Sequence, residues 1–174
     1  DPTVKRQSGF LAPLITNSTT VGAGFTLPYY WAISSDKDLT FTPKFYAGEN
    51  LLFLNEYRQV FRNGFLTLDT SFTDGYKNIS TKKTGGTRNH VFANLNFNFE
   101  QSKYDENSFT IKVERVSNDT YFRIHDINTA LVDSENTNLE NEIKYSLNKN
   151  DMYLDIVTNA YENLREKKKS DKYE

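Results

Sequence analysis

The stretch VFANLNFNFE, residues 91–100, decides the fold class of this chain. Apolar side chains occupy every second position in it: Val91, Ala93, Leu95, Phe97 and Phe99. Amides fill three of the positions between them: Asn94, Asn96 and Asn98. Strict alternation is typical of a β-strand with one apolar and one polar face. The stretch therefore predicts a strand that separates two different environments.

The same period of two recurs along the chain and predicts about nine antiparallel strands. We expect them over residues 8–16, 20–28, 38–47, 50–61, 65–73, 91–100, 108–117, 139–147 and 152–158. Residues 29–37 are expected to form a connection. Tight turns are predicted at residues 17–19, 62–64 and 148–150, where Asn and Gly gather. The connection 118–136 is compatible with a helical turn.

The composition favours a transmembrane β-barrel segment over an ordinary soluble core. Mean hydropathy is only -0.69 although 14% of the residues are aromatic. In a membrane barrel each strand faces lipid on one side and a wet lumen on the other, which keeps average hydropathy low. No stretch approaches the roughly 18 apolar residues of a membrane-spanning helix. The fold class predicted is all-β, an up-and-down antiparallel barrel segment, open and belonging to a larger barrel.

Charge and cysteine content exclude several classes of function. A net charge of -2 gives no support for binding nucleic acid. The basic run at residues 165–169 lies among acids and is interpreted as a solvated loop. No cysteine is present, so neither disulfides nor thiolate chemistry are expected. The chain starts without Met or a signal peptide and is interpreted as a piece of something larger.

Loop lengths agree with the barrel interpretation. If the N-terminus is periplasmic, the connections after the first, third, fifth and seventh strands lie outside the cell. The two longest connections, residues 74–87 and 118–136, both belong to that set. Outer-membrane barrels have long external loops and short periplasmic turns.

Two prolines in the first two predicted strands are the main candidate site. Pro13 and Pro28 lack the N–H that a β-ladder needs, so each weakens pairing or ends its strand. We expect them to loosen a lateral opening where a barrel closes on its last strand. For Pro43 the simpler interpretation, a strand end, is favoured.

Charged and aromatic residues give weaker candidates. Glu56 and Arg58 share one strand face, and Asp69 on the next strand could join them as a lumen ion pair or as a guide for a charged substrate. The run Tyr29, Tyr30 and Trp31 fits an interfacial aromatic belt or a soluble core cluster about equally well.

No catalytic or cofactor site is predicted. His90 and His125 are far apart in sequence and have no metal-spaced partners, so a metal site is not expected. No Ser–His–Asp set or carboxylate pair stands out in the sequence. We expect neither an enzyme nor a cofactor-binding protein.

Four motifs in residues 5–75 resemble the outer-membrane LPS-assembly family LptD (OstA). They are RQSGFLAP at residues 6–13, LPYYWAI at 27–33, DLTFTP at 38–43 and EYR at 56–58. Their order and spacing are similar to those of the family. The segment VSNDTYF, residues 116–122, is similar to a later motif of the family.

The resemblance implies a fold, partners and a location. It implies that residues 1–7 connect to a periplasmic jellyroll, that 8–160 are barrel strands and that 161–174 form a charged loop. It implies a Gram-negative outer-membrane translocon for lipopolysaccharide, with an LptE-like plug lipoprotein and a periplasmic Lpt bridge as partners. It associates Pro13 and Pro28 with a lateral gate between the first and last strands. It implies transport without ATP hydrolysis by this protein.

Two other classes stay open on the sequence alone. One is a soluble β-sandwich or small barrel that binds carbohydrate or lipid; the other is a porin or autotransporter barrel. The membrane interpretation points the apolar residues of two strands outward as one band: Leu95, Phe97, Phe99, Phe109, Ile111 and Val113. It also predicts that Asn94, Asn96 and Asn98 face inward, whereas a soluble fold inverts this polarity.

Overall fold

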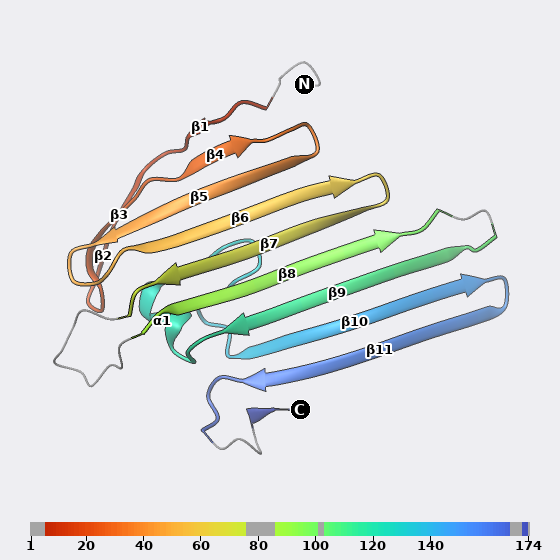
Figure 1. Ribbon diagram of the computed structural model, residues 1–174. Coiled ribbons are helices and arrows are strands. Elements are labelled where there is room, and N and C mark those ends of the chain that lie inside the picture. The colour runs from red at the N-terminus through yellow and green to blue at the C-terminus, as the bar shows by residue number, and fades with distance from the viewer. Residues whose placement is uncertain (1–5, 76–85, 101–102, 168–171, 174) are drawn as a thin grey trace.

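The strands of this protein lie side by side in one antiparallel sheet (Figure 1). The computed structural model describes residues 6–75, 86–100, 103–167 and 172–173. Residues 1–5 of the expected jellyroll connection lie outside these ranges. So do residues 76–85 of the predicted loop and residues 168–171 and 174 of the predicted charged loop. Within the described ranges, no helix is long and apolar enough to cross a membrane.

The described residues form eleven strands and one short helix. The strands are β1 Gly9–Phe10, β2 Leu14–Ser18, β3 Gly22–Thr26, β4 Tyr29–Ala32, β5 Lys37–Tyr46, β6 Leu52–Phe61, β7 Gly64–Thr73, β8 Arg88–Asn98, β9 Glu106–Val116, β10 Asn138–Lys149 and β11 Met152–Asn163. The helix α1, Tyr121–His125, lies in the connection from β9 to β10. This confirms the helical turn that the sequence allowed there.

The eleven strands form nine lines across the sheet, as predicted. The first line consists of β1 and β2 and the second of β3 and β4, since β1 pairs with β4 and β2 pairs with β3. From β5 to β11 each strand pairs with the next one along the chain. The predicted connection at residues 29–37 is wrong in its first part, because β4 continues the second line.

Strand ends differ from the prediction mainly near the C-terminus. The strand β11 runs to Asn163 rather than stopping at residue 158, because all of β10 from Asn138 to Lys149 pairs with it. Leu164 follows as a buried residue. The expected boundary at residue 160 between strands and charged loop is therefore too early.

One face of the sheet is apolar over the whole described width. Cross-strand partners on this face include Phe53 with Phe72, Leu66 with Leu95, Leu95 with Ile111, and Ile111 with Ile143. These side chains stay partly exposed, with Phe72 at 49%, Ile143 at 53% and Ile156 at 56%. An apolar surface of this extent is typical of a membrane or protein contact.

Aromatic rings gather at both ends of the apolar face. Near the long connections, Phe53 stacks on Phe72 at 4.9 Å between ring centroids and on Phe41 at 5.7 Å. Near the short turns, the Phe97 ring lies 5.1 Å from Phe61 and 6.3 Å from Phe99. Membrane barrels carry aromatic girdles at the two edges of their apolar band.

The opposite face of the sheet is polar and charged. Its cross-strand partners include Thr40 with Glu56, Glu56 with Asp69, Thr67 with Asn94, and Asn94 with Lys112. The two faces differ because successive side chains of a strand point to opposite sides. The alternation first seen in residues 91–100 thus extends across the sheet.

A small hydrophobic core lies on the polar face, at the end with the long connections. The connection that carries α1 folds onto β5, β6, β7 and β8 there (Figure 1). Phe122 packs edge-on against Phe92 at 5.4 Å, and the Tyr46 hydroxyl donates to the His125 carbonyl at 3.1 Å. The buried cluster comprises Leu52, Leu54, Phe92, Tyr121, Phe122, Ile127, Val132, Leu139 and Leu164. The remainder of the polar face stays open.

Candidate functional site

The outermost hairpin of the sheet is paired imperfectly at its prolines. Leu14 lies opposite Thr26, and Phe10 lies opposite Tyr29. Three residues of the first line, 11–13, therefore face only two of the second, 27–28. An extra residue of this kind bends a strand and disrupts its ladder. The Leu11 N–H donates to the Pro28 carbonyl at 2.9 Å and bridges the gap.

A third proline adjoins the gap. Pro43 lies inside β5, opposite Phe53 on β6, so the expectation that it ends a strand is wrong. Its carbonyl accepts the Leu27 N–H at 3.3 Å, which places the missing N–H of Pro43 toward the second line. Pro13, Pro28 and Pro43 thus interrupt hydrogen bonding at one level of three adjacent lines. In the described part of the chain, the first line pairs only with the second.

A buried carboxylate on the polar face holds this hairpin to the sheet. Asp38 on β5 is 1% exposed and accepts from Arg6 Nη1 at 2.9 Å and from Arg58 Nε at 2.8 Å. The Tyr30 hydroxyl also donates to Asp38, at 3.3 Å. Asp38 was not predicted as a site residue from the sequence, although it shares one strand face with Thr40 and Thr42 by spacing.

The predicted group of Glu56, Arg58 and Asp69 is only partly formed. Arg58 Nε lies 3.6 Å from Glu56 Oε1, but its shorter contact is to Asp38. Asp69 does not join them, because its Oδ1 pairs with His90 Nε2 at 3.0 Å instead. The expectation for Asp69 is therefore wrong in its partner.

The structure assembles a Ser–His–Asp group that the sequence did not reveal. Ser71 lies directly opposite His90 in the β7–β8 ladder, and its hydroxyl meets His90 Nδ1. The Tyr121 hydroxyl of α1 lies 2.8 Å from Ser71 Oγ. The two residues Asp69 and Ser71 share a strand face, which was visible in the sequence, but the register with His90 was not. All of these side chains are buried.

The remaining candidates divide between the two faces. The amides Asn94, Asn96 and Asn98 lie on the polar face, where Asn96 Nδ2 donates to Thr110 Oγ1 at 3.1 Å. Tyr29 and Trp31 pair with Phe41 and Leu39 on the apolar face.

Tyr30 and the two histidines lie where their positions in the sequence did not indicate. Tyr30 is separated from Tyr29 and Trp31, since it turns to Asp38 on the polar face. His90 and His125, distant in sequence, both pack against the Tyr121 ring, at 6.3 and 5.2 Å.

This chain is similar to curated proteins that carry the name LPS-assembly protein LptD. The LPS-assembly protein LptD of Shewanella oneidensis is 33% identical over 148 residues, which is 74% of this chain and 19% of that protein. The LptD of Nitrosococcus oceani is 31% identical over 127 residues, covering 67% of this chain and 17% of the relative. The LptD of Shewanella frigidimarina is 46% identical over 54 residues, or 31% of this chain and 7% of the relative.

The similarity covers most of this chain but a small part of each relative. The chain spans less than a fifth of the length of the curated relatives it matches. No protein-family model matches the sequence.

Proposed function

Since this chain is LptD-like over about three quarters of its length, we propose that its sheet forms part of the wall of an outer-membrane β-barrel. This barrel assembles lipopolysaccharide into the outer leaflet and releases it beside the first strand line. The relatives bear the name LPS-assembly protein, and the chemistry of the sheet suits such a substrate. The role is transport without covalent chemistry.

The observation that carries the proposal is the division of the sheet into two faces. Lipopolysaccharide has acyl chains that need an apolar environment and sugars that need a polar one. A membrane barrel offers lipid outside and water inside, and each strand here presents apolar and polar side chains in alternation. The partly exposed band from Phe53 to Ile156 supports an outer surface in lipid.

The first hairpin supports a lateral exit at this edge. A sheet parts most easily where its hydrogen bonds are fewest, and the row of Pro13, Pro28 and Pro43 removes donors there. The edge position of β1 and β2 leaves room for a further strand to close the barrel. The gate proposed lies between this first line and that closing strand.

Absence of catalysis is part of the same proposal. Asp69, His90 and Ser71 have the group types of a hydrolase triad, yet they are 0%, 1% and 3% exposed. The Ser71 hydroxyl is also hydrogen-bonded to the Tyr121 hydroxyl. A nucleophile must come within about 3 Å of the group that it attacks, which this burial prevents.

Partners follow from the family alone. An LptE-like plug would lie against the polar face, and the periplasmic Lpt bridge would deliver lipopolysaccharide from below the membrane. The Gram-negative outer membrane is the proposed location. Neither a soluble carbohydrate- or lipid-binding sandwich nor a porin-like channel gives a reason for three prolines at one level of the first three lines of the sheet.

The test replaces both early prolines with residues that restore a ladder donor. In the full-length protein, Pro13→Val with Pro28→Val is expected to slow delivery of lipopolysaccharide to the cell surface several-fold. Thr70→Val, on the apolar face of β7 between Val91 and Asn55, is the matched control and leaves delivery unchanged. Unchanged delivery in the double variant would contradict the gate.

A further inference from the structure

The backbone ladder between β9 and β10 ends before either strand does. These strands pair from Glu106 with Asn148 as far as Lys112 with Glu142. Beyond that point β9 continues beside β8 to Val116, and β10 continues beside β11 to Asn138. The sheet therefore forks at the end with the long connections.

Side chains replace the missing ladder bonds in the fork. The Glu114 N–H donates to Asn141 Oδ1 at 3.0 Å, and the Glu140 N–H donates to Glu114 Oε2 at 2.8 Å. Glu114 is 6% exposed, so its carboxylate is built into the sheet. Side-chain acceptors used in place of ladder bonds satisfy the backbone N–H groups while the two strands separate.

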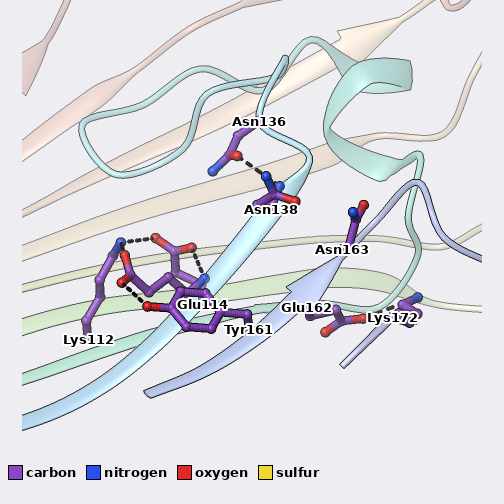
Figure 2. Close-up of a pocket in the computed structure, with 9 residues that line it drawn as sticks. Lys112, Glu114, Asn136, Asn138, Tyr161, Glu162, Asn163 and Lys172 are labelled. Atoms are coloured by element: carbon purple, nitrogen blue, oxygen red, sulfur yellow. Dashed lines mark hydrogen bonds and ion pairs between the residues drawn. The ribbon is translucent and has the colours of Figure 1, made fainter. Parts of the chain in front are cut away.

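A polar cavity of about 450 Å³ lies at this fork (Figure 2). Its volume falls within the roughly 300–1,000 Å³ of small-molecule sites. Figure 2 shows Lys112, Glu114 and Tyr161 grouped on one side, with Glu162 and Lys172 on the other. Lining residues come from β9, β10, β11 and the segments that follow β11 and precede β10.

Both lysines of the cavity form ion pairs with nearby carboxylates. Lys112 Nζ lies 3.1 Å from Glu114 and 2.9 Å from Glu140. Lys172 Nζ lies 3.2 Å from Glu162 and 2.7 Å from Asp119. Desolvation lowers the pKa of Lys172, but its hydrogen bonds to Asp119 and Glu162 outweigh this and raise the pKa overall.

This charge pattern disfavours an anionic ligand. Both lysines already have two carboxylate partners each, and the three glutamates of the lining outnumber the two lysines. A phosphate placed here would meet net negative charge and would have to displace an existing ion pair. An uncharged ligand avoids both costs.

Uncharged groups complete the lining. The side-chain oxygens of Asn136 and Asn163 accept backbone N–H bonds from Asn138 and Arg165, which leaves their amide nitrogens as donors. The Tyr161 hydroxyl donates to Glu140 at 3.3 Å, and the ring is 40% exposed. Amide donors, carboxylate acceptors and an aromatic face are the groups that bind vicinal hydroxyls and the C–H face of a sugar ring.

We propose that this cavity binds an uncharged saccharide unit. The inference rests on the proposed function and deepens it, because it assigns the sugar part of lipopolysaccharide to one place on the polar face. The phosphorylated lipid anchor is excluded from the cavity by the charge argument above. The fork between β9 and β10 is the feature that creates the site.

Photo-crosslinking in cells tests the assignment. The photoreactive residue p-benzoylphenylalanine replaces Tyr161 in the full-length protein. Val157, on the same face of β11 but opposite Lys144 and so away from the fork, serves as the matched control position. Two strains supply either lipopolysaccharide with a neutral polysaccharide or its phosphorylated lipid anchor alone. A third position is Ile15 on the apolar face of the first line, which is itself 80% exposed and reports on release of either lipid.

The expected result is a crosslink from position 161 to the polysaccharide form and none to the lipid anchor, with a several-fold weaker crosslink from position 157. The double variant Asn136→Leu with Asn163→Leu removes both amide donors and should reduce the crosslink at 161 several-fold while the barrel still folds.

Three outcomes overturn the proposal, and they are distinguishable. Equal crosslinks from 161 to both lipids would contradict the saccharide assignment. A crosslink at position 15 without one at 161 would contradict saccharide binding in the cavity but would leave the proposed function intact. The absence of a crosslink at both 15 and 161 would count against the proposed function as well.

Discussion

Glu56 and Asp69 lie directly opposite one another in the β6–β7 ladder, yet their carboxylates have different partners. Glu56 lies 3.6 Å from Arg58 and is partly exposed, whereas Asp69 lies 3.0 Å from His90 and is fully buried. Like charges directly opposite each other destabilise a sheet unless each is compensated. The polar face compensates them with two separate networks.

These networks should differ in their contribution to stability. Asp69→Asn is expected to lower the free energy of unfolding by about 1–3 kcal/mol, since it weakens a buried hydrogen-bonded pair. Glu56→Gln should change it by less than about 1 kcal/mol, because its ion pair is solvated. Denaturant unfolding of the full-length protein in detergent measures both. A larger effect from Glu56→Gln would contradict the network assignment.

Asp38 should fix the first hairpin to the sheet. Asp38→Ala leaves Arg6, Arg58 and Tyr30 without their shared acceptor, and the loss of these hydrogen bonds should cost about 1–3 kcal/mol because the two arginines are half exposed. We expect faster amide hydrogen exchange in β1 to β4 and unchanged exchange in β9 to β11. Asp36→Ala, two residues away in an exposed turn, is the matched control. Amide exchange that rises equally in all strands of Asp38→Ala would contradict this prediction.

Gly64 marks a close contact between two strands. A Cβ at this position would overlap the Asn96 carbonyl and lie 2.7 Å from Phe97 Cδ1. Gly64→Ala is expected to destabilise the protein by about 1–3 kcal/mol through overpacking. Gly9→Ala, where a Cβ meets nothing within 4 Å, should be tolerated. Equal thermal stability of the two variants would disprove the steric argument.

Asp36 provides a prediction about pH. The Ser34 hydroxyl donates to its carboxylate at 2.6 Å and, together with a backbone hydrogen bond, lowers the pKa of Asp36. A depressed pKa in the folded state stabilises above the unfolded pKa, and this contribution is lost as the pH falls through the lowered value. Ser34→Ala should raise the pKa of Asp36 toward that of a free carboxyl. An NMR titration that shows no change would rule out the hydroxyl as the main cause.

Period-two alternation was sufficient to predict the nine lines of the sheet, because it depends only on neighbours in the chain. It failed where long-range pairing overrides local signals. Pro28 suggested a strand end, but pairing with β5 continues the second line through Tyr29. Pro43 suggested another strand end. The position of its missing N–H faces the second line beside Pro28, where the ladder is already interrupted, so β5 continues through it.

Side-chain partners depended on register and could not be predicted. Asp69 and Ser71 were recognisable on one face, but only the β7–β8 register brings His90 between them. The fork at Glu114 was equally hidden, because nothing in the residues 113–116 and 138–141 shows where the pairing of β9 with β10 stops. Asp38, by contrast, begins a clear alternating strand and was predictable as a polar-face residue.

The polarity of the two faces is the central claim, and spin-label accessibility along β8 tests it most directly. Single nitroxide labels at residues 91–98 of the full-length protein in lipid bilayers would be exposed to oxygen and to a water-soluble nickel complex. We predict a period of two, with oxygen contact highest at Val91, Ala93, Leu95 and Phe97 and nickel contact highest at Asn94, Asn96 and Asn98. Inverted polarity, or no period at all, would contradict the account.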